Sequence, residues 1–246
     1  MTFPTILFGA FDRHNFGDLL FPHVAAALLP ARPLIFAGLA ERDMREWGGH
    51  PVHAITQLAE TWGDKPIRLI HAGGELLTCK AWEAAVMLQP PAAAQVIVSR
   101  LDASPSARDA WTERILGLPS HAPYCVSPGL FPAAQRRVYC AVGGVELADS
   151  PAELRDEVIT ALRAANAVGV RDRLTLAHLR AAGIQARLMP DPAVMVAELF
   201  GPTIGAHAAQ GELADIRAAF PKGYLAVQLR ADFGDDATLE IGRAHV

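Results

Sequence analysis

The amino-acid sequence predicts an α/β protein built on a Rossmann-like, doubly wound, mostly parallel sheet. Short apolar runs of strand length alternate with helix-length segments along the chain, and this alternation is typical of right-handed β-α-β units. The runs are continuously apolar, as expected of parallel strands that are covered on both faces. Of the 246 residues, 51% are hydrophobic and 20% are charged, which indicates a packed globular core.

Eight segments have the length and composition of such strands. In chain order they are Thr5–Phe8, Leu34–Ala37, Val52–Ile55, Ile67–His71, Val138–Val142, Ala167–Val170, Ala186–Met189 and Tyr224–Leu229. The carboxyl ends of parallel strands meet at one edge of a sheet. The loops that follow these segments are therefore predicted to share that edge.

Helix signals are clearest in the second half of the chain. Ser150 and Glu153, with Pro151 between them, form a predicted capping box that opens a helix running to about residue 165. A second helix is predicted over Arg173–Ala182, closed by Gly183 in the left-handed conformation. A third is predicted from about residue 204 to 220.

The stretch from about Gln89 to Pro132 is rich in proline. Within it only Ser104–Leu116 has a helical pattern. We therefore expect the remainder to form a long irregular insertion or a lid.

The domains are predicted to be unequal in length. Residues 1–221 form one Rossmann-like domain, and residues 222–240 have the pattern of a new strand, loop and helix start. We interpret this second stretch as the beginning of a truncated C-terminal Rossmann-like domain, because a one-turn helix cannot bury its apolar face. Residues 241–246 can be encoded by an in-frame read into a common sequencing-library adapter. We interpret them as a non-native tail, the alternative being a natural helical end.

Composition and charge argue against several classes of protein. A net charge of -4 and a pI of about 6.1 give no support for a nucleic-acid or membrane-surface partner. The most apolar region, residues 19–40, is interrupted by His23, Arg32 and three prolines, so no transmembrane segment is expected. No secretory signal is visible, and a cytoplasmic location is expected. The three cysteines are widely spaced, which predicts reduced thiols and no metal site.

The most informative loop is Gly9–Asp18, which joins the first predicted strand to the first predicted helix. This order places backbone N–H groups and the positive end of a helix dipole at the carboxyl edge of the sheet, where anionic ligands bind. Arg13 and His14 add positive charge, and Asn15 is a favourable N-cap. The alternative is structural: Asn15 and Gly17 shape the helix start, and the acidic first turn complements the dipole.

Three other loops at this edge carry candidate residues. Gly73-Gly74 follows the fourth predicted strand and lets the backbone approach a ligand, although a plain tight turn has the same pattern. Arg171 suits bidentate binding of a phosphate or carboxylate, or a structural ion pair with Asp172 or Asp191. Asp191 lies between two prolines, which predicts a rigidly placed carboxylate or simply a rigid turn.

Taken in order, these motifs resemble those of the polysaccharide pyruvyl transferase family. The matching pieces lie within about residues 5–195 and are Asn15-Phe16-Gly17-Asp18, Ala72-Gly73-Gly74, Val170-Arg171-Asp172 with Leu179 and Gly183-Ile184, and Pro190-Asp191-Pro192. The chain departs from the family pattern at the second motif, where Ala72 replaces the first of three glycines and Glu75 follows. The C-terminal domain of the family, with its Arg-x-His-Gly type motif, would lie beyond residue 246.

The resemblance implies a fold, a reaction and a set of site residues. The fold is the N-terminal half of a GT-B-like two-domain architecture. The reaction transfers the enolpyruvyl group of phosphoenolpyruvate, a co-substrate, to a sugar of a surface polysaccharide or its precursor, which forms a pyruvate ketal; no cofactor is expected. Asp18 is the candidate base. The candidate substrate-binding residues are Arg13, His14, Asn15, Gly17, Asp18, Gly73, Gly74, Arg171, Asp172 and Asp191.

The resemblance places the main catalytic acid in the missing C-terminal half, so we expect the 246-residue chain to be inactive alone. Two alternatives from other classes remain. One is a GT-B-type glycosyltransferase that uses a nucleotide sugar, and the other is a non-catalytic module that binds a sugar or nucleotide.

Overall fold

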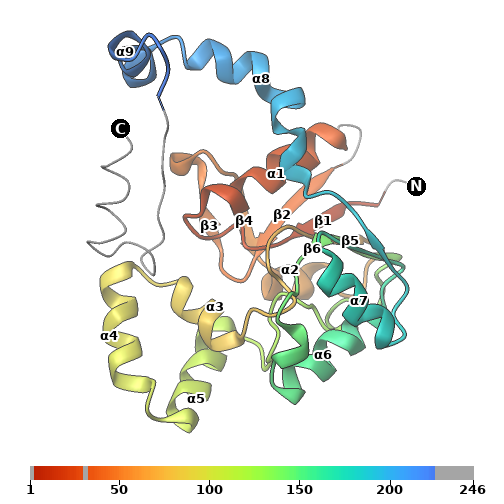
Figure 1. The fold of residues 1–246 in the computed structure, drawn as a ribbon. Coiled ribbons are helices and arrows are strands. Elements are labelled where there is room, and N and C mark those ends of the chain that lie inside the picture. The colour runs from red at the N-terminus through yellow and green to blue at the C-terminus, as the bar shows by residue number, and fades with distance from the viewer. Residues whose placement is uncertain (1–2, 30–32, 225–246) are drawn as a thin grey trace. The chain divides into compact units, whose positions relative to one another are not determined.

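The computed structural model of the protein describes residues 3–29 and 33–224. The chain divides into two compact units, Met1–Leu199 and Phe200–Val246, and the first contains the sheet (Figure 1). The strands are β1 (Thr5–Phe8), β2 (Leu34–Gly38), β3 (Arg42–Asp43), β4 (Pro51–Ala54), β5 (Arg68–Ala72), β6 (Arg136–Val142), β7 (Ala167–Val170) and β8 (Ala186–Leu188). The α-helices are α1 (Phe16–Leu28), α2 (Ile55–Trp62), α3 (Ala81–Met87), α4 (Pro91–Leu101), α5 (Pro105–Leu116), α6 (Ala152–Arg163), α7 (Arg173–Ala181), α8 (Val196–His207) and α9 (Gly211–Ala219). Short 3-10 helices include η3 (Leu147–Asp149) and η4 (Pro192–Met195).

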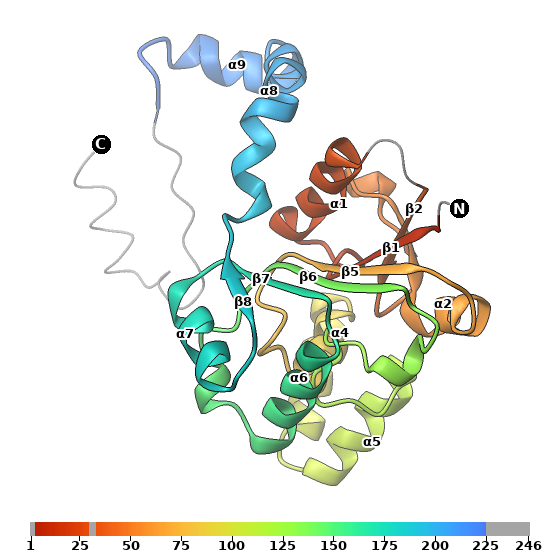
Figure 2. The same ribbon diagram turned by 90° about the vertical axis from the view of Figure 1, so that its right-hand side faces the viewer.

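Within the described residues the strands form one sheet in the order β3-β4-β2-β1-β5-β6-β7-β8. All neighbouring pairs are parallel except β3 with β4. The chain first moves from β1 to β2 and β4, then returns to the other side of β1 through β5. Right-handed crossovers that move in opposite directions place their helices on opposite faces. Figure 2 shows α1 on one face of the sheet and α2, α4, α5 and α6 on the other.

Side chains of β1 show how the two faces are filled. Ile6 and Phe8 point into the larger core, which also contains buried residues of α2, α3, α6 and α7. Leu7 points to the opposite face and packs with Leu19 and Phe21 of α1. Successive residues of a strand face opposite sides, so a continuous apolar run is what a strand buried on both faces requires. The predicted doubly wound α/β sheet is confirmed.

Seven of the eight predicted strands are present, with ends that differ by up to two residues. The sequence pattern missed β3, a two-residue antiparallel strand too short to carry an apolar signal. Of the predicted strand Tyr224–Leu229, the structure describes only Tyr224; the residues from 225 onward, including the interpreted tail, lie outside the described part of the chain.

The predicted helix over residues 204–220 is wrong, because two helices, α8 and α9, occupy this stretch and its surroundings. Gly211 has a φ of +60°, and a left-handed residue cannot continue a right-handed helix. The predicted capping box at Ser150 is also wrong. Pro151 takes the N-cap position of α6, and the Ser150 hydroxyl donates to the Glu146 carbonyl at 3.0 Å.

The region around residues 89–132 is more regular than predicted. It contains α4 and α5, which together cover residues 91–101 and 105–116. Pro91 and Pro105 each stand in the first turn of a helix. A backbone N–H at that position has no partner within the helix, so the missing N–H of proline costs nothing, and the fixed φ of proline suits the helix. The helical pattern predicted over Ser104–Leu116 is confirmed by α5, whereas α4 shows that the prediction of an irregular remainder is wrong for residues 91–101.

The predicted closure of α7 is confirmed. The N–H groups of Gly183 and Ile184 donate to the carbonyls of Arg180 and Leu179 at 3.0 and 2.9 Å, which is the Schellman pattern. In the part of the chain that the structure describes, no helix has both the length and the apolar character needed to span a bilayer.

Candidate functional site

The candidate residues gather at the carboxyl edge of the sheet, around the place where the strand order reverses. β1 lies between β2, which follows it in the chain, and β5, which comes after β4. The loops after β1 and β5 therefore lead toward opposite faces of the sheet, and such a strand-order reversal is the position where open α/β sheets bind ligands. Gly9–Asp18 follows β1, and Gly73-Gly74 follows β5.

Arg13 and Asp18 form an ion pair in the loop after β1. Nη2 and Nε of Arg13 lie 3.0 and 3.1 Å from Oδ2 of Asp18, and the two side chains are only 18% and 10% exposed. The Arg13 guanidinium also lies over the ring of Tyr124 at 6.0 Å. Burial raises the pKa of the Asp18 carboxyl, against the opposing charges of Arg13 and Arg171.

The start of α1 is capped by its own loop. Oδ1 of Asn15 accepts hydrogen bonds from the N–H groups of Gly17 and Asp18 at 3.0 and 3.4 Å, which confirms the predicted N-cap. The prediction that the N–H near Gly17 is free for an anion is wrong, because the Asn15 side chain already accepts it. His14 is exposed, and its ring lies 6.1 Å from that of Trp47.

Gly73-Gly74 is fitted closely against α1. Gly73 has a φ of +85°, and a Cβ there would lie 2.2 Å from the Phe21 ring. A Cβ on Gly74 would lie 3.3 Å from Oδ1 of Asp18. The two glycines therefore let the β5 loop pass directly beside the Arg13–Asp18 pair.

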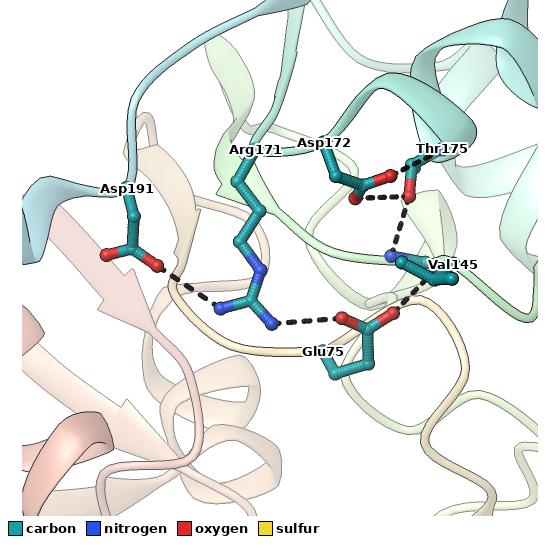
Figure 3. A network of polar contacts seen from close by, with 7 residues as sticks. Glu75, Val145, Arg171, Asp172, Thr175 and Asp191 are labelled. Atoms are coloured by element: carbon teal, nitrogen blue, oxygen red, sulfur yellow. Dashed lines mark hydrogen bonds and ion pairs between the residues drawn. The ribbon is translucent and has the colours of Figure 1, made fainter.

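Arg171, at the end of β7, pairs with two carboxylates (Figure 3). Its Nη2 lies 2.9 Å from Oε2 of Glu75, and its Nη1 lies 3.2 Å from Oδ2 of Asp191. The predicted pairing with Asp191 is thus confirmed, and the alternative pairing with Asp172 does not occur. The Arg171 side chain is 31% exposed, so solvent reaches this network.

Asp172 has a structural position. It is the N-cap of α7, and its carboxylate accepts from the N–H and hydroxyl of Thr175 at 2.7 and 2.6 Å. The Thr175 hydroxyl oxygen in turn accepts from the N–H of Gly144 at 3.0 Å. Asp172 therefore joins α7 to the loop after β6 and does not face the Arg171 guanidinium (Figure 3).

The loop after β6 completes the network. The N–H of Val145 donates to Oε1 of Glu75 at 2.7 Å, and the N–H of Gly143 donates to the Gly74 carbonyl at 2.8 Å. A Cβ on Gly143 would lie 2.1 Å from Oε2 of Glu75, so only glycine lets Glu75 reach Arg171 here. Just before it, Ala141 has a φ of +51° beside a register shift between β6 and β7. Such bulges redirect a chain at functional edges.

Two residues of this edge, Glu75 and Asp12, are not among the site residues predicted from the sequence. Glu75 was noted only as a departure from a glycine pattern, yet it is the nearest carboxylate to Arg171. Asp12 is fully buried, and its Oδ2 accepts from the N–H of Ala40 at 2.7 Å. Its Oδ1 has no hydrogen-bond partner in the described structure, and burial raises its pKa. The sequence does mark Asp12 as unusual, because it is an acidic residue directly after the apolar residues that begin the loop.

Comparison of the chain with protein-family models, curated proteins and solved structures found no match. The carboxyl edge of the sheet carries two arginines and the Gly73-Gly74 turn. Its carboxylates are those of Asp12, Asp18, Glu75 and Asp191, with Asp172 turned toward α7.

Proposed function

We propose that this edge binds phosphoenolpyruvate and that the protein belongs to the machinery of pyruvyl transfer to a saccharide. The observation that supports the proposal most directly is the convergence of Arg13, Asp18, Gly74, Glu75 and Arg171 at the strand-order reversal of the sheet. A small molecule with a phosphate and a carboxylate needs cationic groups at two points, and the two arginines supply them.

In this proposal one anionic group of the ligand replaces Glu75 as a partner of the Arg171 guanidinium. That guanidinium is shared between Glu75 and Asp191, and a third carboxylate or a phosphate would be repelled by both. Glu75 therefore swings away when the anion binds, because its contacts are the partly exposed Arg171 and a single N–H, that of Val145. The released Glu75 is then available to accept a hydrogen bond from a saccharide hydroxyl.

Asp18 is the proposed general base. Arg13 holds its Oδ2, which leaves Oδ1 facing Gly74. A saccharide hydroxyl loses its proton to Oδ1 as its oxygen bonds to the carbon that bears the phosphate, and an acid protonates the methylene carbon. Attack of the second hydroxyl on that carbon closes the ketal and displaces phosphate, which takes up the proton of that hydroxyl as it leaves. The raised pKa of Asp18 makes it a stronger base than an exposed carboxylate.

The proposal includes a GT-B-like arrangement, in which a second domain faces this edge and supplies the acid. The resemblance in the sequence motifs supports this part. A crevice closed from both sides excludes water, which strengthens every charge interaction inside it. We accordingly expect the 246-residue chain to bind phosphoenolpyruvate without releasing phosphate from it.

Calorimetric titration of the purified chain with phosphoenolpyruvate tests the binding. We expect Arg171→Met to weaken binding about tenfold or more, as expected for loss of a charge-assisted bidentate contact. Arg163→Met is the matched control, since Arg163 is an exposed arginine in the last turn of α6. It precedes β7 and so belongs to the opposite, amino edge. Equal affinity in all three proteins, or tight binding of a nucleotide sugar in place of phosphoenolpyruvate, would contradict the proposal.

A further inference from the structure

A pocket of about 740 Å³ lies in the helical part of the first unit, away from the residues assigned above. Its walls come from the start of α3, from α5, from the loop after α5 and from the start of α6. Figure 1 shows α3, α4 and α5 side by side in this part of the molecule. A volume of this size is within the range of small-molecule sites.

The pocket is held open by hydrogen bonds between its walls. Glu157 of α6 accepts from the backbone N–H of His121 at 2.7 Å and from the Ser120 hydroxyl. The His121 carbonyl accepts from the N–H of Ala81, at the start of α3, at 3.1 Å. The loop after α5 is thus fastened to both neighbouring helices, so the pocket is formed before any ligand arrives.

Aromatic and charged side chains lie together on the wall formed by α3 and α5. The rings of Trp82 and Trp111 meet edge to face at 5.3 Å, and the Arg108 guanidinium lies over Trp82 at 5.7 Å. The nearest carboxylate, that of Asp102, lies 3.7 Å from Arg108 Nη1. Arg108 Nε is buried and has no hydrogen-bond partner in the described structure.

The charges of the lining select the class of ligand. Four carboxylates and two basic side chains line the pocket; they belong to Glu83, Asp102, Asp109, Glu113, Lys80 and Arg108. The excess of negative charge disfavours an anion such as a sugar phosphate. A ligand cation is disfavoured too, because Arg108 already occupies the attractive position over the Trp82 ring.

We propose that this pocket binds a neutral saccharide. Hydroxyl groups both donate and accept, so one sugar ring can donate to Asp109 or Glu113 and accept from Arg108. The half-buried indole of Trp82 adds apolar surface beside the Arg108 guanidinium, and the apolar face of the sugar ring lies against that surface.

The pocket is a site separate from the carboxyl edge, and the inference holds whether or not that edge binds phosphoenolpyruvate. The two sites are nevertheless connected by a short segment, because Lys80 in the pocket is five residues beyond Glu75. Five residues span at most about 18 Å. A saccharide chain held in the pocket therefore lies within reach of the edge as a few sugar units.

Intrinsic tryptophan fluorescence of the purified chain, titrated with maltotriose, cellotriose and galactotriose, tests the proposal. We expect saturable binding of at least one of them, weakened tenfold or more by Trp82→Leu and about threefold or more by Asp109→Asn. The Asp109 side chain is exposed on α5, so this variant folds even if the tryptophan variant does not. Trp62→Leu, on α2 outside the pocket, is the matched control and should leave binding unchanged.

The competing outcomes are distinct. Failure of all three trisaccharides to bind, or binding that is unchanged in both pocket variants, would overturn the proposal. Glucose 6-phosphate and spermidine are the charged probes, and binding of either as tightly as the best trisaccharide would overturn it as well. Arg171→Met should leave trisaccharide binding intact, so failure at the carboxyl edge and failure at the pocket give different results.

Discussion

Two arginines serve the same edge of the sheet in different ways. Arg13 is mostly enclosed and has one carboxylate partner, Asp18, with Tyr124 and Met87 against the rest of its guanidinium. Arg171 is more exposed and has two partners, Glu75 and Asp191. We call Arg13, Asp18 and the Gly73-Gly74 turn the β1–β5 region. Arg171, its partners Glu75 and Asp191, and Gly143 beside them form the β6–β7 region.

The difference teaches which charges a ligand can recruit. A buried pair must keep its partner, because an uncompensated buried charge is costly, whereas an exposed pair contributes little and exchanges partners freely. The β1–β5 region therefore sets the shape and the base of the proposed site. The β6–β7 region is the part that responds to an anion.

The largest expected effect tests this contrast directly. Arg13→Met leaves the enclosed Asp18 carboxylate without its partner and should lower the free energy of unfolding by about 3 kcal/mol or more. Arg171→Met, the matched change in the exposed region, should lower it by at most about 1 kcal/mol. Urea denaturation followed by circular dichroism measures both. Equal losses would show that the two regions do not differ in the way described.

A pair of glycines sharpens the comparison further. Gly73→Ala puts a Cβ against the enclosed Phe21 ring at a positive φ, and we expect a loss of about 2–3 kcal/mol. Gly143→Ala meets only the ends of the Glu75 and Arg171 side chains, which can move. It should cost about 1 kcal/mol or less while displacing Glu75 from Arg171. Thermal unfolding of both variants gives the comparison, and a greater loss for Gly143→Ala would reverse it.

A third contrast concerns the dependence of stability on pH. His71, on β5 one residue before Ala72, stacks on Tyr139 at 4.0 Å and is fully buried, and burial lowers its pKa to about 3. Below about pH 6.5 the unfolded chain takes up this proton and the folded chain does not. Stability should therefore fall as the pH is lowered from about 6.5 toward 3, by up to about 1.4 kcal/mol per pH unit from this residue. His71→Gln should be less stable at neutral pH and show a shallower slope in urea denaturation; an unchanged slope would contradict the assignment.

The sequence was most informative where the deciding interactions are local. The N-cap at Asn15 and the closure of α7 at Gly183 each depend on residues within five positions, and the structure has both. Apolar runs likewise predicted seven strands, because burial on both faces leaves a composition that one strand carries alone. The helix that begins at Pro91 was not predicted, since proline starts a helix at its first turn and breaks one elsewhere.

The site itself shows the limit of local information. The sequence by itself determined the α/β class, the loops that share the carboxyl edge and the residue types available there. Only the tertiary structure decided which charges meet: Glu75 and Arg171 are 96 residues apart in the chain and face each other because β5, β6 and β7 are neighbours in the sheet. The physical reason is that caps and apolar runs follow from neighbouring residues, whereas the pairing of charges follows from strand order and from what each side chain's burial allows.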